Sequence, residues 1–75
     1  MSNTTEQDIQ AMGDSVDVIN RLVAVEALSN EERVYLRANA DHLSIMLGRD
    51  NIQAYTGDKS VYVTAIHAGY AKLGV

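Results

Sequence analysis

The stretch SNEERVYLRANADHLSIMLGR, residues 29–49, carries the clearest structural pattern in the chain. Ser29 and Glu32 have the spacing of a capping box, in which each side chain bonds the other residue's backbone N–H at a helix start. Small and large apolar residues then recur every three or four positions, as on one face of a helix; they are Leu36, Ala40, Leu43 and Leu47. Gly48 follows, where a left-handed C-terminal cap is expected. The stretch therefore predicts a helix over residues 30–47.

The same predicted helix has a second apolar face, formed by Val34, Ala38 and Ile45. At about 100° per residue, these side chains lie almost opposite the first apolar stripe. A helix at the edge of a small bundle needs only one apolar face to pack. Two apolar faces predict that this helix is sandwiched between others, in its own chain or in another copy.

Chain length and cysteine content also point to self-association. The chain has 75 residues and no cysteine. A domain this short buries only about 60% of its unfolded surface, so disulfides, metals or further subunits commonly add to its stability. Because disulfides are excluded, we expect a homo-oligomer.

Two polar strips separate the apolar faces of the predicted helix. One consists of Tyr35, Asn39, His42 and Met46, and the other of Arg33, Arg37 and Ser44 with Asp41 beside them. A ring, an amide and an imidazole suit recognition of a small polar ligand, and arginine suits bidentate contacts with phosphate. The simpler interpretation is a half-buried flank at a helix interface, since tyrosine and histidine are commonly intermediate in burial.

Two further helices are predicted on either side of this one. The spacing of Ile9, Met12, Val16, Ile19 and Val23 indicates a helix over about residues 5–27, which leaves only residues 28–29 as a connection. Residues 60–66 are ambiguous, because their β-branched side chains suit a strand. Tyr62, Ala65, Gly69 and Leu73 nevertheless recur at helical spacing, and no partner strand is evident. We therefore predict a helix over residues 59–73.

Composition and motifs argue against several functional classes. The net charge is −4, which disfavours general nucleic-acid binding, since that affinity rests on neutralising phosphates. The chain lacks a cysteine nucleophile and any known metal-ligand spacing, and its neighbouring acids lie in turns that look solvated. We expect no catalysis, no metal and no cofactor. We also expect no signal peptide and no membrane contact, since no apolar run approaches the length of a membrane span.

The run LRANADHLSIML, residues 36–47, resembles small uncharacterised proteins of tailed bacteriophages. Those proteins look like short helical chains with an Asn-x-x-His-Leu-x-x-Met-Leu core, and some also resemble the ending AIHAG at residues 65–69. The similarity covers about half of the chain and does not include the first predicted helix. It implies a phage origin and location in the host bacterial cytoplasm, and it implies no mechanism.

Together these observations predict an all-α fold for residues 1–75. A helical hairpin carries a third, C-terminal helix and assembles as a homo-oligomer. We expect a non-enzymatic phage accessory protein that acts by stoichiometric binding, as an anti-defence protein that captures a host immune protein or a small anionic nucleotide signal between subunits. The alternative is a virion structural or assembly component. The predicted ligand-binding residues are Arg33, Tyr35, Arg37, Asn39, His42 and Tyr70.

Overall fold

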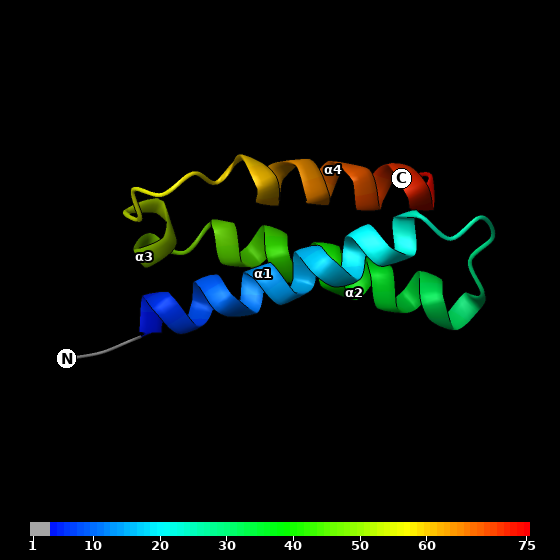
Figure 1. Cartoon of the computed structure of the whole chain (residues 1–75), viewed down its shortest axis with the longest axis horizontal. Coiled ribbons are helices and arrows are strands. Elements are labelled where there is room, and N and C mark those ends of the chain that lie inside the picture. The colour runs from blue at the N-terminus through cyan, green and yellow to red at the C-terminus, as the bar shows by residue number, and fades with distance from the viewer. Residues whose placement is uncertain (1–3) are drawn as a thin grey trace.

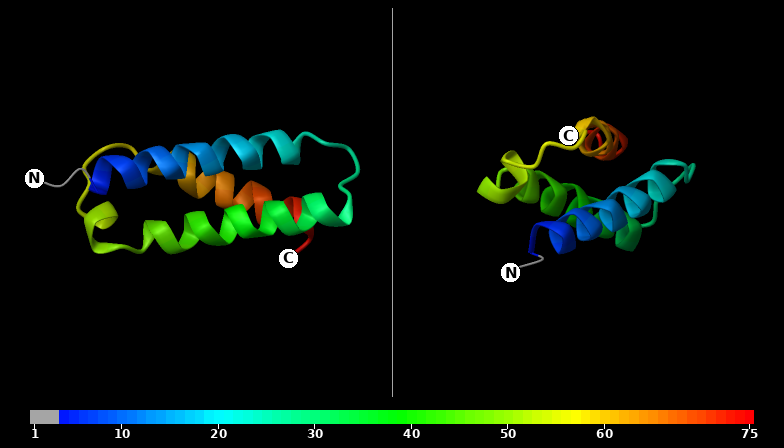
Figure 2. Two further views of the ribbon diagram at one scale, coloured as in Figure 1. Left: turned by 90° about the horizontal axis from the view of Figure 1, so that it is seen from below. Right: turned by 60° about the vertical axis from the view of Figure 1, so that its left-hand side comes forward.

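Three long helices and one short helix make up the structure, a computed structural model that describes residues 4–75. They are α1 (Thr4–Val23), α2 (Asn30–Leu47), α3 (Asp50–Gln53) and α4 (Ser60–Leu73), and no strand occurs within the described range. α1 and α2 form an antiparallel hairpin, and α4 lies along it in contact with both (Figure 1). The bundle is elongated, 44 × 18 × 16 Å, and α3 lies at one end of it (Figure 2). The predicted all-α class is confirmed.

α2 begins and ends at the residues that the sequence predicts. The Ser29 hydroxyl accepts the backbone N–H of Glu32 at 3.1 Å, and the Glu32 carboxylate accepts the backbone N–H of Ser29 at 2.8 Å. This confirms the capping box. The left-handed cap predicted at Gly48 is wrong, because its φ is −82°. The chain changes direction one residue later, at Arg49, whose extended backbone leads directly into α3.

α1 is shorter than its hydrophobic pattern suggests. It ends at Val23, and residues 24–29 form the connection in place of the predicted residues 28–29. The backbone N–H of Val25 bonds the Leu22 carbonyl at 3.1 Å, which closes a turn as the helix ends. The longer connection lets Leu28 fold back and pack against the core. A helix continued through Ala27 would leave too little chain for that reversal.

The core lies along the axis between the three long helices. Its fully or nearly buried apolar residues are Met12, Val16, Ile19, Leu22, Leu36, Ala40, Leu43, Met46, Ile52, Tyr62 and Ala65. The predicted stripe of α2 is therefore buried at Leu36, Ala40 and Leu43, while Leu47 is only partly buried. Placing Met46 on a polar flank was wrong, since its side chain is 3% exposed. It is buried because α1 packs on the side of α2 that carries Tyr35, Asn39 and His42. There α1 covers the C-terminal end of this strip, where Met46 lies.

The ambiguous segment at residues 60–66 is helical. Val61 and Val63, which suit a strand, are about half exposed, whereas Tyr62, Ala65 and Gly69 face the core and are buried. Burial of these core-facing residues against the neighbouring helices thus stabilises a helix over a strand in this segment. Gly74 ends α4 in the left-handed conformation, with a φ of 81°. Lys59 occupies the N-cap position of α4, and the Asp58 carboxylate accepts the backbone N–H of Ser60 at 2.9 Å.

Gly69 lies where α4 packs against both of the other long helices. A methyl group at this position would lie 3.4 Å from the Ala40 Cβ and 3.5 Å from side-chain carbons of Ile19 and Leu36. The small residue therefore allows close approach of α4 to α1 and α2. By contrast, a methyl group at Gly13 in α1 would have no neighbouring atom within 4 Å.

Candidate functional site

The outer face of α2 carries the second apolar set predicted from the sequence. We call Val34, Ala38 and Ile45 the outer ridge. Val34 is 70% and Ile45 68% exposed, and Ala38 is also exposed. α1 and α4 both pack on the opposite side of α2, against Leu36 and Leu43. Within residues 4–75, the predicted sandwich is therefore incomplete, because the neighbouring helices pack against only one of the two apolar faces.

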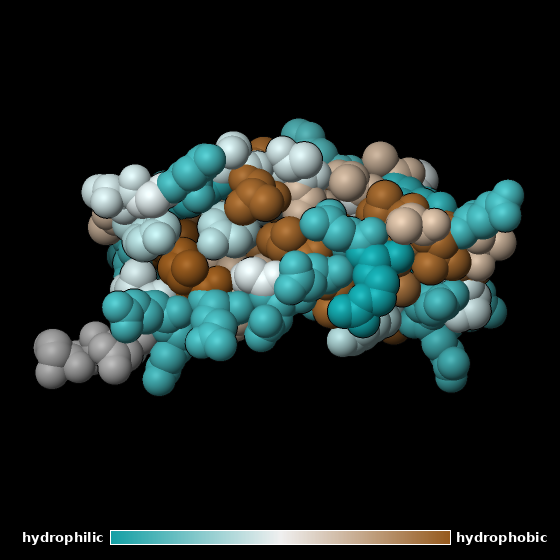
Figure 3. Space-filling view, in the orientation of Figure 1, coloured by the Kyte–Doolittle hydropathy of each residue, from teal (hydrophilic) through white to brown (hydrophobic). Residues whose placement is uncertain are grey.

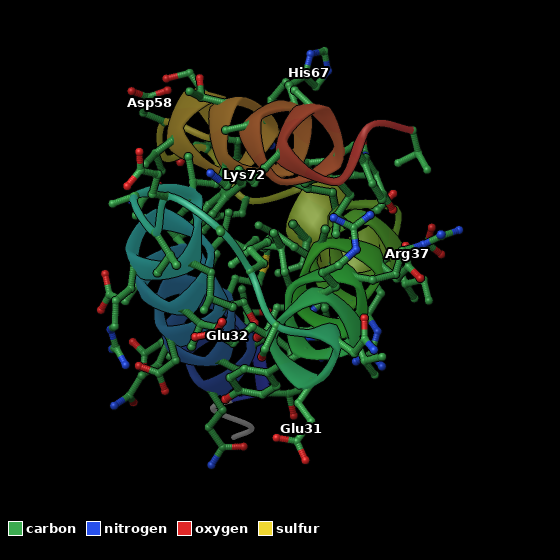
Figure 4. The ribbon with its side chains drawn as sticks, turned by 90° about the vertical axis from the view of Figure 1, so that its right-hand side faces the viewer. Glu31, Glu32, Arg37, Asp58, His67 and Lys72 are labelled. Carbon is green, nitrogen blue, oxygen red and sulfur yellow. The ribbon has the colours of Figure 1, made fainter. Side chains whose placement is uncertain are left out.

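Beside the outer ridge, α2 and the C-terminal end of α4 form an open groove of about 260 Å³. Its lining residues are Arg33, Val34, Arg37, Leu73 and Val75, and we call it the arginine groove. An Nη2 nitrogen of Arg33 donates to the Leu73 backbone carbonyl at 3.0 Å, which ties the guanidinium to the last turn of α4. Arg37 extends outward from α2 on the same flank (Figure 4). The groove thus offers two guanidinium groups on an otherwise apolar wall.

A series of polar contacts joins Arg37, in the arginine groove, to Tyr70 of α4. The Nε of Arg37 lies 3.7 Å from a carboxylate oxygen of Asp41, and the Tyr70 hydroxyl donates to the other carboxylate oxygen. The hydrogen bond to Asp41 raises the pKa of the Tyr70 hydroxyl above its ordinary value, and desolvation adds to the rise. Both members of the Arg37–Asp41 pair remain about half exposed. Arg37 therefore stays accessible to an anion, although Asp41 offsets part of its charge.

The other flank of α2 faces α1 and contains the remaining predicted residues. Tyr35 is 56% exposed. The Asn39 side-chain amide donates to the Tyr35 carbonyl of the preceding turn at 2.9 Å. The Nδ1 of His42 lies 3.4 Å from the Ser15 hydroxyl of α1. This amide and imidazole therefore already have partners within the fold, whereas the Tyr35 and His42 side chains are themselves exposed.

A second, shallower hollow lies between the outer ridge and this flank, with a volume of about 510 Å³. Asn30, Glu31, Val34, Tyr35 and Ala38 line it. Glu31 points away from α4 at this end of the bundle (Figure 4). Because a carboxylate repels anions, this hollow suits an apolar or cationic group better than a phosphate.

The structure thus divides the six predicted site residues into two groups. Arg33, Arg37 and Tyr70 lie together on the α4 side of the outer ridge, and Tyr35, Asn39 and His42 lie on the α1 side. Helical geometry alone predicts that the arginines and Tyr35 are separated. Sequence reasoning missed the contribution of Leu73 and Val75 to the groove, because no local pattern shows where the end of α4 packs.

A second group of polar side chains joins α1 to the α3 end of the bundle, where the Asn51 side-chain amide donates to an Asp8 carboxylate oxygen at 3.0 Å and Arg49 lies 3.6 Å from the same oxygen. Among the described residues, no group of three or more histidines and acids is close enough to hold a metal ion. His67 points outward from α4, in a different direction from Arg37 of α2 (Figure 4). Hydrophobic residues also show along the junction of α1 and α4, above a hydrophilic stretch of α1 (Figure 3). None of the helices in residues 4–75 combines the length and apolar character needed to cross a membrane.

Comparison of the chain with protein-family models matched no family, and comparisons with curated proteins and with solved structures matched no relative.

Proposed function

We propose that this protein acts by stoichiometric binding and without catalysis, as a phage anti-defence protein. In this proposal it captures a host immune protein or a small anionic nucleotide signal at a site between the subunits of a homo-oligomer. The observation that carries the proposal is the exposed outer ridge lying directly beside the arginine groove, since Val34 lines both. Apolar area supplies affinity for a macromolecule, and guanidinium groups supply affinity for phosphate.

The composition of the groove supports binding over chemistry. Its lining consists of two arginines and three aliphatic residues. Such a lining offers hydrogen-bond donors and positive charge, and it contains no nucleophile and no general base. Arginine is the better residue for holding a phosphate group in a fixed orientation, because its planar fork makes two parallel hydrogen bonds.

An aromatic ring beside the arginines would complete a nucleotide site. Tyr70 is on the same flank as Arg37, and Asp41 joins the two residues. Tyr35 is on the other flank of α2, so within one subunit it does not face the same ligand. A nucleotide held by Tyr35 and by arginines therefore requires two subunits.

Calorimetric titration with cyclic dinucleotides and ADP-ribose derivatives tests the nucleotide version of this proposal. The double variant Arg33→Gln with Arg37→Gln should lose binding and keep the oligomeric state, because both side chains are exposed. The matched control, Arg21→Gln with Lys72→Gln, removes two positive charges outside the arginine groove and should bind as wild type does. If wild type binds none of these nucleotides, the nucleotide version fails and capture of a host protein becomes the better explanation.

A virion or assembly role is the second candidate, because an exposed apolar ridge suits a subunit contact without any ligand. Val61 and Val63 of α4 add further exposed apolar surface, at 50% and 45%. Mass spectrometry of purified virions separates the two candidates. A structural protein should be present in many copies per particle, whereas an anti-defence protein should be found in infected cells with its ligand or host partner.

A further inference from the structure

We propose that the arginine groove binds a carboxylate flanked by aliphatic side chains, on an acidic segment of a partner protein, and that it prefers this group to a phosphate. This inference deepens the proposed function, because it rests on capture of a host protein and names the chemistry of the captured surface. Three observations carry it: the uncompensated charge of Arg33, the compensated charge of Arg37, and the aliphatic wall beside them.

Arg33 is held in place, but its charge has no carboxylate partner. Its Nη2 donates to the Leu73 backbone carbonyl at 3.0 Å, at the end of α4 where a cationic side chain stabilises the last carbonyls. That bond uses one of the five N–H donors of the guanidinium. Within residues 4–75, Arg33 makes no ion pair, in contrast to Arg37 and Arg49. Capping α4 therefore orients Arg33, and its exposed guanidinium keeps further donors for a ligand.

The charge of Arg37, by contrast, is already offset. A carboxylate oxygen of Asp41 lies 3.7 Å from the Arg37 Nε, and the Tyr70 hydroxyl donates to the other oxygen. Asp41 is thus held beside the groove as a negative group, and Arg33 supplies the one positive charge in excess. A phosphate monoester carries a charge of about −1.5 to −2 at neutral pH, so Asp41 would repel it more strongly than it would repel a single carboxylate. Charge balance therefore favours the carboxylate.

The wall of the groove distinguishes an acidic protein segment from a nucleotide. A nucleotide phosphodiester also carries only one charge, but its base gains affinity by stacking on an aromatic ring. The wall consists of Val34, Leu73 and Val75, and the groove lining includes no aromatic residue. Tyr70 is nearby, but its hydroxyl is bonded to Asp41 and its ring is not part of this wall. Aliphatic side chains beside a carboxylate would instead bury apolar area against the wall.

Titration with three capped tripeptides, followed by NMR of the backbone amides, tests the class of ligand. The first peptide, acetyl-Leu-Glu-Leu-amide, carries the proposed carboxylate; the second replaces glutamate with glutamine, and the third with phosphoserine. The glutamate peptide should shift the signals of Arg33 and of residues 73–75. The glutamine peptide should bind up to about fivefold more weakly, as expected for loss of an exposed charged contact. The phosphoserine peptide should bind no more tightly than the glutamate peptide.

Three results of this titration would overturn the proposal. They are tighter binding of the phosphoserine peptide than of the glutamate peptide, equal binding of the glutamate and glutamine peptides, and no shift of these signals with any peptide. Each result would show that the groove does not select a carboxylate.

A pair of variants then locates the preference for glutamate over glutamine. Arg33→Gln removes the uncompensated charge and should bind both peptides equally, while its circular dichroism stays helical because Arg33 is exposed. The matched control is Arg21→Gln, which removes an exposed arginine of α1 and should keep the preference of wild type. An Arg33→Gln variant that keeps this preference overturns the proposal.

Failure of this inference and failure of the proposed function give different results. Binding of a cyclic dinucleotide in the calorimetric titration, without a preference for the glutamate peptide, overturns the inference and leaves the proposed function intact. A clear preference for the glutamate peptide, in a protein that captures no host protein in infected cells, supports the ligand class and removes only the anti-defence role.

Discussion

Replacing Gly69 with residues of increasing size measures how closely the three long helices approach one another. A methyl group at this position would meet carbons of Ala40, Ile19 and Leu36 at 3.4–3.5 Å, which is ordinary contact distance. Gly69→Ala should therefore fit, and it should gain up to about 1 kcal/mol because alanine favours a helix interior over glycine. Gly69→Val adds further carbons where those neighbours already lie, and overpacking of this kind costs about 1–3 kcal/mol.

The same two substitutions at Gly13 provide the control. A methyl group there has no neighbour within 4 Å, so Gly13→Ala and Gly13→Val should differ only in helix propensity, by less than about 1 kcal/mol. Denaturant unfolding followed by circular dichroism, at one fixed protein concentration, gives the four free energies. The alanine-to-valine difference should be larger at Gly69 by about 1–3 kcal/mol, or roughly 4–20 °C in melting temperature for a domain of this size. Equal differences at the two positions would show that α4 does not pack as closely as described.

Two further predictions concern the core and the polar contact between α2 and α4. Leu43 is fully buried, so Leu43→Ala should lower the free energy of unfolding by about 2–5 kcal/mol. The control Ser44→Ala, on the exposed side of α2, should change it little. A melting temperature of Leu43→Ala within a few degrees of wild type would contradict the buried position. Because the folded protein raises the pKa of Tyr70, the stability this residue contributes is fully present below about pH 10 and is lost as the pH rises further. The difference in unfolding free energy between wild type and Tyr70→Phe should therefore decline from pH 9 to pH 11. A difference that stays constant over this range would show that the hydrogen bond to Asp41 does not supply the stability that Tyr70 contributes.

The sequence by itself determined α2 and its buried stripe. Its capping box joins Ser29 to Glu32, three residues apart, and its stripe repeats within a single helix. These signals act over one to four turns, so a local pattern is sufficient to find them. Helical geometry alone likewise places Tyr35 and the two arginines on different flanks of α2.

Helical spacing in the sequence already favoured a helix over residues 60–66, which the structure confirms, but only the tertiary structure decided where α1 ends and that Met46 belongs to the core. In each case the free energy comes from contacts with other helices. The arginine groove also depends on such contacts, since Leu73 and Val75 reach α2 only when α4 packs antiparallel to it. Hydrophobic periodicity shows which face of a helix is buried, but the neighbour that covers the face depends on the packing of the whole chain.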